Sequence, residues 1–77
     1  MNENIVRSSV TGTEYDTNKV IRILNYKQAA LYMAHGARLY DVYPSKNSKT
    51  GETCLVYIFD RQDTKPLYEL WINYELG

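Results

Sequence analysis

Cys54 and His35 are the first side chains to consider for chemistry, because a histidine can activate a cysteine thiol as a nucleophile. Cys54 lies in the run TCLVYIF, residues 53–59, which is the most apolar stretch of the chain. A thiol in such a run typically packs as an inert core group. One cysteine and one histidine are also too few for a structural zinc site, which needs four ligands. The pattern therefore favours a packing role for Cys54.

Asp60 and Asp63 are two carboxylates three residues apart, a spacing that could serve a metal ion or acid–base catalysis. At the start of a helix, the same residues more commonly cap free N–H groups and interact with the helix dipole. No serine lies in a G-x-S-x-G motif, and the four glycines form neither a P-loop nor G-x-G-x-x-G. The sequence therefore predicts a protein that is not an enzyme, with no catalytic residue, metal ligand or cofactor.

Basic residues gather in the middle of the chain, although nine Lys and Arg balance nine Asp and Glu overall. Residues 19–49 contain a single acid, Asp41, and residues 50–77 contain five acids against two cations. Tyrosines lie between the cations of the middle segment, and such a face can hold a nucleic-acid strand by phosphate contact and stacking. The other interpretation is a solvated surface with half-buried tyrosines. The candidate nucleic-acid contacts are Lys19, Arg22, Lys27, Arg38, Lys46 and Lys49.

The elements that must position these residues begin with a strand and a helix. Residues 19–24, KVIRIL, are rich in β-branched residues and leucine and predict a strand, with Ile21 and Ile23 on one face. Asn25 and Gln28 form a capping-box pattern that starts a helix. Gly36 ends this helix, because glycine adopts the left-handed conformation at low cost.

Two strands and a second helix follow. Residues 38–43 alternate as a strand that Pro44 should end, because proline donates no hydrogen bond to a ladder. The polar stretch 45–52 predicts a hairpin loop, and residues 53–59 predict the central strand. The N-cap of the last helix is expected to be Asp63 or Thr64, with Pro66 in the first turn. Its core stripe is predicted to be Leu67, Leu70, Trp71 and Tyr74.

Together these elements predict one small α+β domain over residues 19–77, in the order β-α-β-β-α. Its three-stranded, largely antiparallel sheet would pack with two helices in a two-layer structure. Residues 1–18 are polar and predict a flexible N-terminal arm, or alternatively an edge strand over residues 5–10. No apolar run approaches the roughly 20 residues that span a bilayer, and no signal peptide is evident. We expect a cytoplasmic protein without membrane contact.

A second apolar stripe on the last helix is the candidate partner-binding surface. Tyr68, Ile72 and Leu76 recur every four residues, on a different face from the core stripe. They either widen the core contact or form an exposed patch, which on a small protein indicates a partner or a homodimer. A sheet of three strands also leaves open edges that can bind a partner. Glu69 and Glu75 would add negative charge to this surface.

The segments NYKQAALYMAHGARLYDVY and LVYIFDRQDTKPLYELWINY resemble a short uncharacterised domain family of bacteria and their phages. The residues that carry the resemblance are Gln28, Ala29, Tyr32, His35, Gly36, Phe59, Asp60, Leu67 and Trp71. The family has no assigned activity, so the resemblance implies only a context, that of a mobile-element accessory protein. It leads us to expect a non-enzymatic protein-interaction module that inhibits a host or defence enzyme. The alternative is a nucleic-acid-binding protein that uses the basic, tyrosine-rich middle segment.

Overall fold

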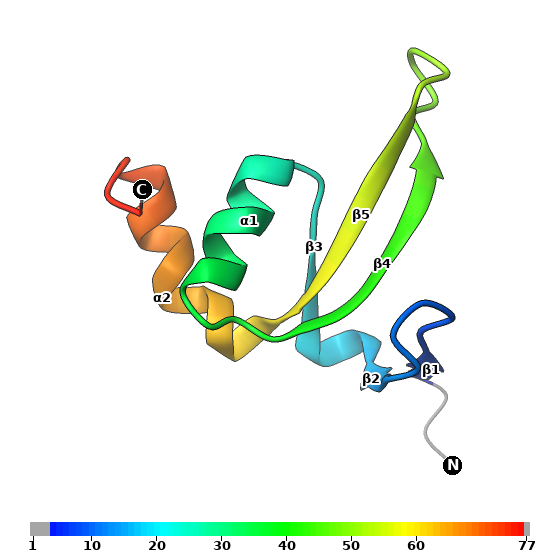
Figure 1. Cartoon of the computed structure of the whole chain (residues 1–77), viewed down its shortest axis with the longest axis horizontal. Helices are drawn as coiled ribbons and strands as arrows, with labels where there is room; N and C mark the ends of the chain where they lie inside the picture. Colours follow the sequence, from blue (N-terminus) through cyan, green and yellow to red (C-terminus); the bar gives the residue numbers. More distant parts are fainter. Residues whose placement is uncertain (1–3, 77) are drawn as a thin grey trace.

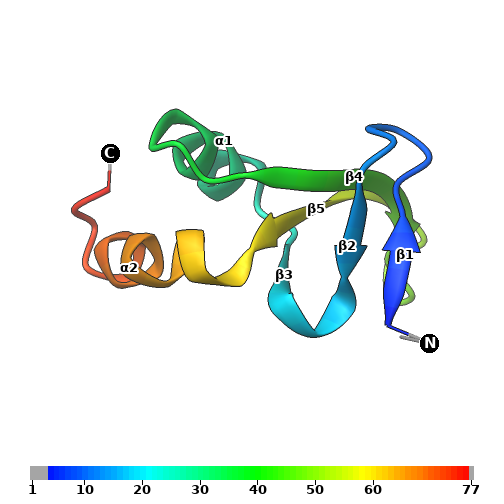
Figure 2. The same ribbon diagram turned by 90° about the horizontal axis from the view of Figure 1, so that it is seen from below.

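The computed structural model describes residues 4–76 and shows a small α+β domain, as predicted. Its elements are β1 (Ile5–Arg7), β2 (Glu14–Asp16), the 3₁₀ helix η1 (Thr17–Lys19), β3 (Val20–Ile23), α1 (Tyr26–Ala34), β4 (Leu39–Lys46), β5 (Thr53–Asp60) and α2 (Arg61–Ile72). Strands β3, β5 and β4 form an antiparallel sheet with β5 in the centre, which confirms the predicted central strand (Figure 1). The helices lie at one end of the molecule and the β1–β2 hairpin at the other (Figure 2).

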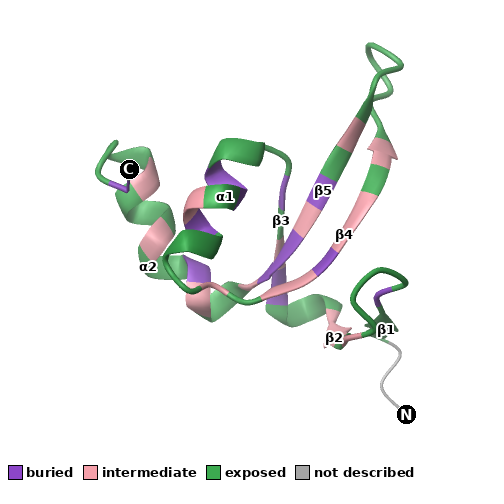
Figure 3. Ribbon diagram, in the orientation of Figure 1, coloured by how far each residue is buried: buried purple, intermediate pink, exposed green. Residues whose placement is uncertain are grey.

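The sheet buries apolar side chains on both of its faces. On one face, Ile23 and Phe59 pack with Ala29 and Tyr32 of α1 and with Leu67 and Trp71 of α2, so both helices share this face. The Tyr32 ring meets the Phe59 ring edge to face, with centroids 5.6 Å apart. On the other face, Val20, Val56 and Ile58 pack with three tyrosines, Tyr15, Tyr40 and Tyr43. Figure 3 shows the buried positions concentrated in β3, β5 and α1.

The segment predicted as a flexible arm forms the β1–β2 hairpin, which contacts β4. The hairpin is anchored by Ser8, whose hydroxyl donates to the buried carboxylate of Asp41 at 2.5 Å. The Tyr15 hydroxyl donates to the other oxygen of Asp41 at 2.8 Å, and Thr11 Oγ1 donates to the Tyr40 carbonyl at 2.6 Å. A loose arm was therefore the wrong interpretation for residues 5–16, because their polar side chains find partners on β4.

Pro44 does not end β4, which continues to Lys46. The strand can contain a proline because β4 lies at the edge of the sheet, where an N–H that faces solvent is not needed. A bulge between Leu39 and Asp41 also breaks the predicted alternation. As a result Tyr40 and Tyr43 both pack on the face that the hairpin covers.

Helix α2 begins three or four residues earlier than predicted, because its N-cap is Asp60 and not Asp63 or Thr64. The Asp60 carboxylate accepts the N–H of Asp63 at 3.0 Å, so Asp63 lies in the first turn. Pro66 therefore lies inside the helix, where it removes one backbone donor. The Thr64 hydroxyl donates to the carbonyls of Asp60 and Arg61 in the same turn.

Helix α1 begins and ends as predicted. Asn25 is the N-cap, and its side chain accepts the N–H groups of Lys27 and Gln28. The Gln28 side chain does not return to Asn25 but donates to the buried Tyr32 hydroxyl at 2.9 Å, so the capping box is only half formed. Gly36 follows the helix with φ +86°, the left-handed conformation that glycine tolerates.

The end of α2 differs from the prediction, and this difference relocates Leu76. The helix stops at Ile72, and a Schellman motif follows, in which Glu75 N–H donates to the Leu70 carbonyl and Tyr74 N–H to that of Trp71. Tyr74 is outside the helix and 95% exposed, so it is not a core residue. The chain turns back there and buries Leu76 in the core, at 5% exposure.

Replacing Tyr74 by glycine is expected to stabilise the fold by about 1 kcal/mol, which raises the melting temperature by about 4–8 °C. Tyr74 has φ +60°, a left-handed conformation that is unfavourable for residues with a Cβ atom. Its side chain is exposed, so little buried apolar area would be lost on substitution. Thermal unfolding followed by circular dichroism measures the change. Asn73→Gly is the control, because Asn73 has φ −94° and should lose stability on the same substitution. A Tyr74→Gly variant no more stable than the Asn73→Gly variant would contradict the expected strain.

Candidate functional site

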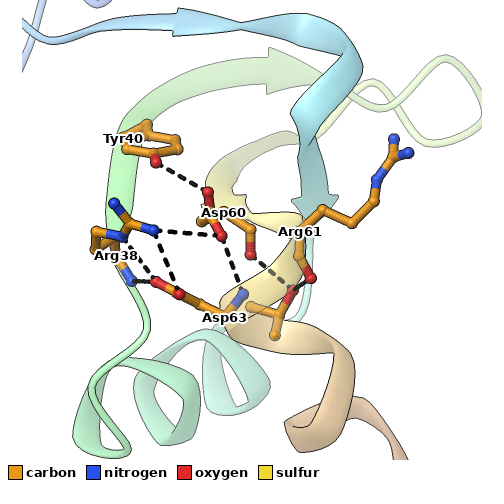
Figure 4. Close-up of polar contacts among 6 residues, drawn as sticks. Arg38, Tyr40, Asp60, Arg61 and Asp63 are labelled. Carbon is orange, nitrogen blue, oxygen red and sulfur yellow. Dashed lines mark hydrogen bonds and ion pairs between the residues drawn. The ribbon is translucent and has the colours of Figure 1, made fainter.

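The junction between β4, β5 and α2 holds a polar cluster that positions the start of α2 (Figure 4). Arg38 Nε donates to Asp63 at 3.0 Å, and Arg38 Nη2 lies 3.6 Å from the Asp60 carboxylate. The Tyr40 hydroxyl donates to the other Asp60 oxygen at 2.9 Å. Asp60 therefore caps the helix, and Asp63 in the first turn pairs with Arg38, in line with the structural interpretation of these two carboxylates.

The pKa values of the cluster follow from these contacts. Hydrogen bonds from the Arg38 side chain and backbone lower the pKa of Asp63 below its ordinary value. Burial, together with the hydrogen bond to Asp60, raises the pKa of Tyr40. The Asp63 carboxylate is therefore ionised while it is paired with Arg38, and it has no proton to donate near neutral pH. Within residues 4–76, no three His, Cys, Asp or Glu side chains gather where they could hold a metal ion.

Cys54 and His35 are not brought together. Cys54 lies near the start of β5, next to the loop that joins β4 to β5. It is half-buried, and its thiol lies 3.4 Å from the Ser45 carbonyl oxygen. His35 caps the end of α1, and its Nε2 lies 3.1 Å from the Leu76 carbonyl. Each side chain therefore interacts with backbone of a different part of the fold, and the two do not form a nucleophile–base pair.

A groove between the outer side of β3 and helix α2 is the candidate binding site, with a volume of about 570 Å³. We call it the β3–α2 groove. Three consecutive residues of β3 line it, although successive side chains of a strand point to opposite faces. The groove therefore runs along the edge of the strand. Its lining residues are Ile21, Arg22, Ile23, Gln28, Arg61, Thr64, Lys65, Tyr68 and Glu69.

The pattern of backbone hydrogen bonds shows which groups of β3 face this groove. Asp60 N–H donates toward β4, to the Arg38 carbonyl at 3.2 Å, and Val20 is paired with Asp60. Because alternate residues of an antiparallel strand direct their backbone groups to opposite sides, Val20 and Arg22 direct theirs away from β5. The Val20 carbonyl indeed accepts a hydrogen bond from the Arg61 guanidinium at 3.3 Å. The N–H and C=O of Arg22 are the next groups along this open edge.

The border of the β3–α2 groove carries excess positive charge. Arg22, Arg61 and Lys65 contribute three cations, and Glu69 is the one acid among the lining residues. The apolar part comes from Ile21 of β3 and from Tyr68, which is 52% exposed, and the largely buried Ile23 adds only a small area. The protein as a whole has no net charge, so this local excess distinguishes the groove from the average surface.

The residues of the predicted partner surface lie in different parts of the fold. Tyr68 and Glu69 line the β3–α2 groove. Ile72, which is exposed, lies instead in a second hollow of about 640 Å³ between α1 and the end of α2, lined by Lys27, Leu31, Trp71, Ile72, Tyr74 and Leu76. Glu75 lies beyond α2, in the segment that turns back. Leu76 was wrongly assigned to an exposed stripe, because the helix ends before it and the turn carries it into the core.

The six cations of the candidate nucleic-acid surface are spread over different parts of the fold. Arg38 is paired with Asp60 and Asp63, and Lys46 lies at the other end of β4, about 25 Å away by strand rise. Lys49 lies in the loop after β4, and Lys27 borders the second hollow. Lys19 belongs to η1, beside a hollow under the N-terminal hairpin. Arg22 alone of the six lines the β3–α2 groove.

Arg61 and Lys65 are groove residues that the sequence-based prediction missed. They lie four residues apart, and Tyr68 and Glu69 continue the same stripe of the helix surface. The stripe was not recognised because the helix was expected to start at Asp63 or Thr64, which left Arg61 in a loop. Recognition of Asp60 as the N-cap would have placed all four residues on one helix.

Comparison of the chain with protein-family models, curated proteins and solved structures finds no match. The resemblance to a domain family of bacteria and phages therefore stays a prediction. Neither helix in the part of the chain that the structure describes has the length and apolar character needed to cross a membrane.

Proposed function

We propose that this chain is a non-enzymatic protein-interaction module that binds its partner in the β3–α2 groove. The observation that carries the proposal is an apolar groove that borders an open strand edge, a combination that peptide-binding domains use for recognition. Tyr68 supplies a large, half-exposed ring at the groove, and tyrosine is enriched in protein interfaces.

The two edges of the sheet differ in a way that supports this choice of surface. The β4 edge carries Pro44, a bulge next to Tyr40 and a hydrogen bond from Thr11 of the hairpin to the Tyr40 carbonyl. Proline, bulges and covering segments are among the devices that prevent strand addition. Strand β3 contains neither a proline nor a bulge, and an apolar groove follows its edge. We therefore place partner binding on the β3 side.

The identity of the partner as a host or defence enzyme is the narrower form of this proposal, and it rests on the sequence resemblance alone. Nucleic-acid binding is the alternative that the basic middle segment suggests. The ion pairing of Arg38 and the spread of the other cations do not favour it.

Site-specific photocrosslinking tests the proposal. The photoreactive residue p-benzoylphenylalanine replaces Tyr68 in the full chain, expressed in the cells in which the protein naturally occurs. We expect one dominant crosslinked protein from position 68 and none from the control position Leu55, which is similarly exposed at 47% but does not line the groove. Position Ile72 samples the second hollow. Equal crosslinking at Leu55, or crosslinking at Ile72 in place of Tyr68, would contradict binding in the β3–α2 groove.

A further inference from the structure

We infer that the occupant of the β3–α2 groove is an extended, acidic segment of another protein that adds to the sheet as a strand beside β3. This inference rests on the proposed function, and it specifies the chemistry of the partner. It follows from three features of the groove: the outward backbone groups of β3, the apolar side chains beneath them and the cations around them.

The backbone geometry offers an incoming strand two hydrogen bonds at Arg22. Its N–H and C=O point away from β5, as the register of Val20 with Asp60 and the Asp60–Arg38 bond require. At Val20 the carbonyl is already occupied by the Arg61 side chain. An added strand would therefore pair first at Arg22, and it could displace the Arg61 guanidinium, which would then be available to a carboxylate.

The side chains of the groove define what an added strand should carry. Residues of the incoming strand alternate between the face of Ile21 and Ile23, where Tyr68 also lies, and the face of Arg22. The first set meets apolar groups, and the second set meets a guanidinium. Arg61 and Lys65 border the groove on the α2 side. A segment of about four to six residues that alternates apolar and acidic side chains matches both faces.

A second copy of this chain matches the groove less well. If two β3 edges paired around a twofold axis, each copy would place Arg22, Arg61 and Lys65 against the same three cations of its partner. Like charges that face each other across a strand pair are destabilising. A nucleic-acid strand would use the cations but would place its charged backbone beside the apolar groups of the groove, Ile21 and the half-exposed Tyr68 ring. An acidic peptide strand satisfies both parts of the groove.

Selection from a library of random ten-residue peptides displayed on phage, with the full chain immobilised, tests the inference. We expect the enriched peptides to alternate apolar and acidic residues. The most enriched peptide, synthesised and labelled with fluorescein, then serves as the probe. A double Arg61→Glu and Lys65→Glu variant should bind it at least tenfold more weakly. Enrichment of basic or helix-forming peptides, or of none, would overturn the inference.

Two substitutions at Arg22 separate the backbone contact from the charge. Arg22→Ala keeps the N–H and removes the guanidinium, and we expect about a twofold to fivefold weaker affinity for the probe. Arg22→Pro also removes the N–H, on the side of β3 that β5 does not use, so edge pairing is lost while the sheet is retained. We expect affinity at least tenfold weaker than that of Arg22→Ala. Equal affinities of the two folded variants would overturn strand addition.

Amide hydrogen exchange of the wild-type chain gives a readout that does not depend on a variant. The Arg22 N–H should exchange at least tenfold more slowly when the probe is bound. An unchanged Arg22 amide with the probe bound would overturn strand addition. If a partner still crosslinked at position 68 in that case, the proposed function would be retained and only strand addition would be rejected. Loss of the Tyr68 crosslink would contradict the proposed function itself, so the two failures are distinguishable.

Discussion

Replacing Asp41 by alanine is expected to lower the free energy of unfolding by about 3 kcal/mol. The buried carboxylate accepts hydrogen bonds from Ser8 at 2.5 Å and from Tyr15 at 2.8 Å, and these are two of the three side-chain hydrogen bonds described above between the N-terminal hairpin and β4. Alanine would leave both hydroxyl groups without their acceptor. Because Ser8 is itself buried, its hydroxyl could not readily turn to water. Urea and thermal unfolding measure the loss.

Two control variants distinguish the loss of these hydrogen bonds from the loss of one negative charge. Glu52→Ala removes an exposed acid and should change stability by no more than about 0.5 kcal/mol. Asp41→Asn keeps one acceptor oxygen and should lose less than Asp41→Ala. Equal stability of Asp41→Ala and wild type would show that the hairpin is not held by this carboxylate.

The titration of Tyr15 reports the same attachment locally. Burial, and then its hydrogen bond to Asp41, raise the pKa of Tyr15 to about 12. Because this folded-state pKa lies above the ordinary value of about 10, its contribution to stability is complete below pH 10 and is lost as the pH rises toward 12. In Asp41→Ala the titration of Tyr15, followed through the NMR signals of its ring, should shift to lower pH. An unshifted titration would contradict release of the hairpin.

Replacing Phe59 by alanine is expected to remove about 4 kcal/mol, which is most of the stability of a chain this short. Phe59 is fully buried in the central strand, pairs with Ile21 and Leu39, and meets the Tyr32 ring edge to face. A single hydrophobic core in a chain of about this length rarely supplies more than about 3–5 kcal/mol, so the variant should be largely unfolded near 37 °C. Loss of circular dichroism and of amide dispersion in NMR spectra measures it.

A conservative control variant shows whether the loss of stability comes from the cavity that alanine would leave at position 59. Phe59→Leu keeps most of the apolar volume and should lose about 1–2 kcal/mol. A Phe59→Ala variant that unfolds at nearly the wild-type temperature would mean that the two helices do not depend on the ring for their packing against β5.

Local patterns in the sequence predicted most of the secondary structure of residues 19–77. The run 53–59 is strongly apolar because β5 is the central strand and is buried on both faces from Val56 to Phe59, although Leu55 near its start is exposed. Asn25 and Gly36 marked the ends of α1, because capping depends on side chains and φ values within a few residues. The prediction failed where the conformation or burial of a residue depends on residues that lie far away in the chain. Pro44 is tolerated because β4 lies at an edge, and Ser8 is buried because Asp41 lies opposite.

The candidate site was predicted only in part, for the same reason. Tyr68 and an open sheet edge were foreseen, but Leu76 was placed on a helix that ends at Ile72. Arg61 and Lys65 were overlooked, since their importance depends on the position of α2 beside β3. Neither the edge position of β3 nor the direction of its free backbone groups can be inferred from residues 19–24 alone.

The sequence by itself determined the order of the strands and helices over residues 19–77 and the apolar character of the central strand, and it contains no recognisable catalytic motif. These properties depend on side-chain type and short-range periodicity. The tertiary structure decided the docking of the N-terminal hairpin on Asp41, the burial of Leu76 and the assembly of the β3–α2 groove. Each of these joins residues that lie far apart in the chain. Such contacts form only when the register of the sheet and the packing of both helices on one face are established together.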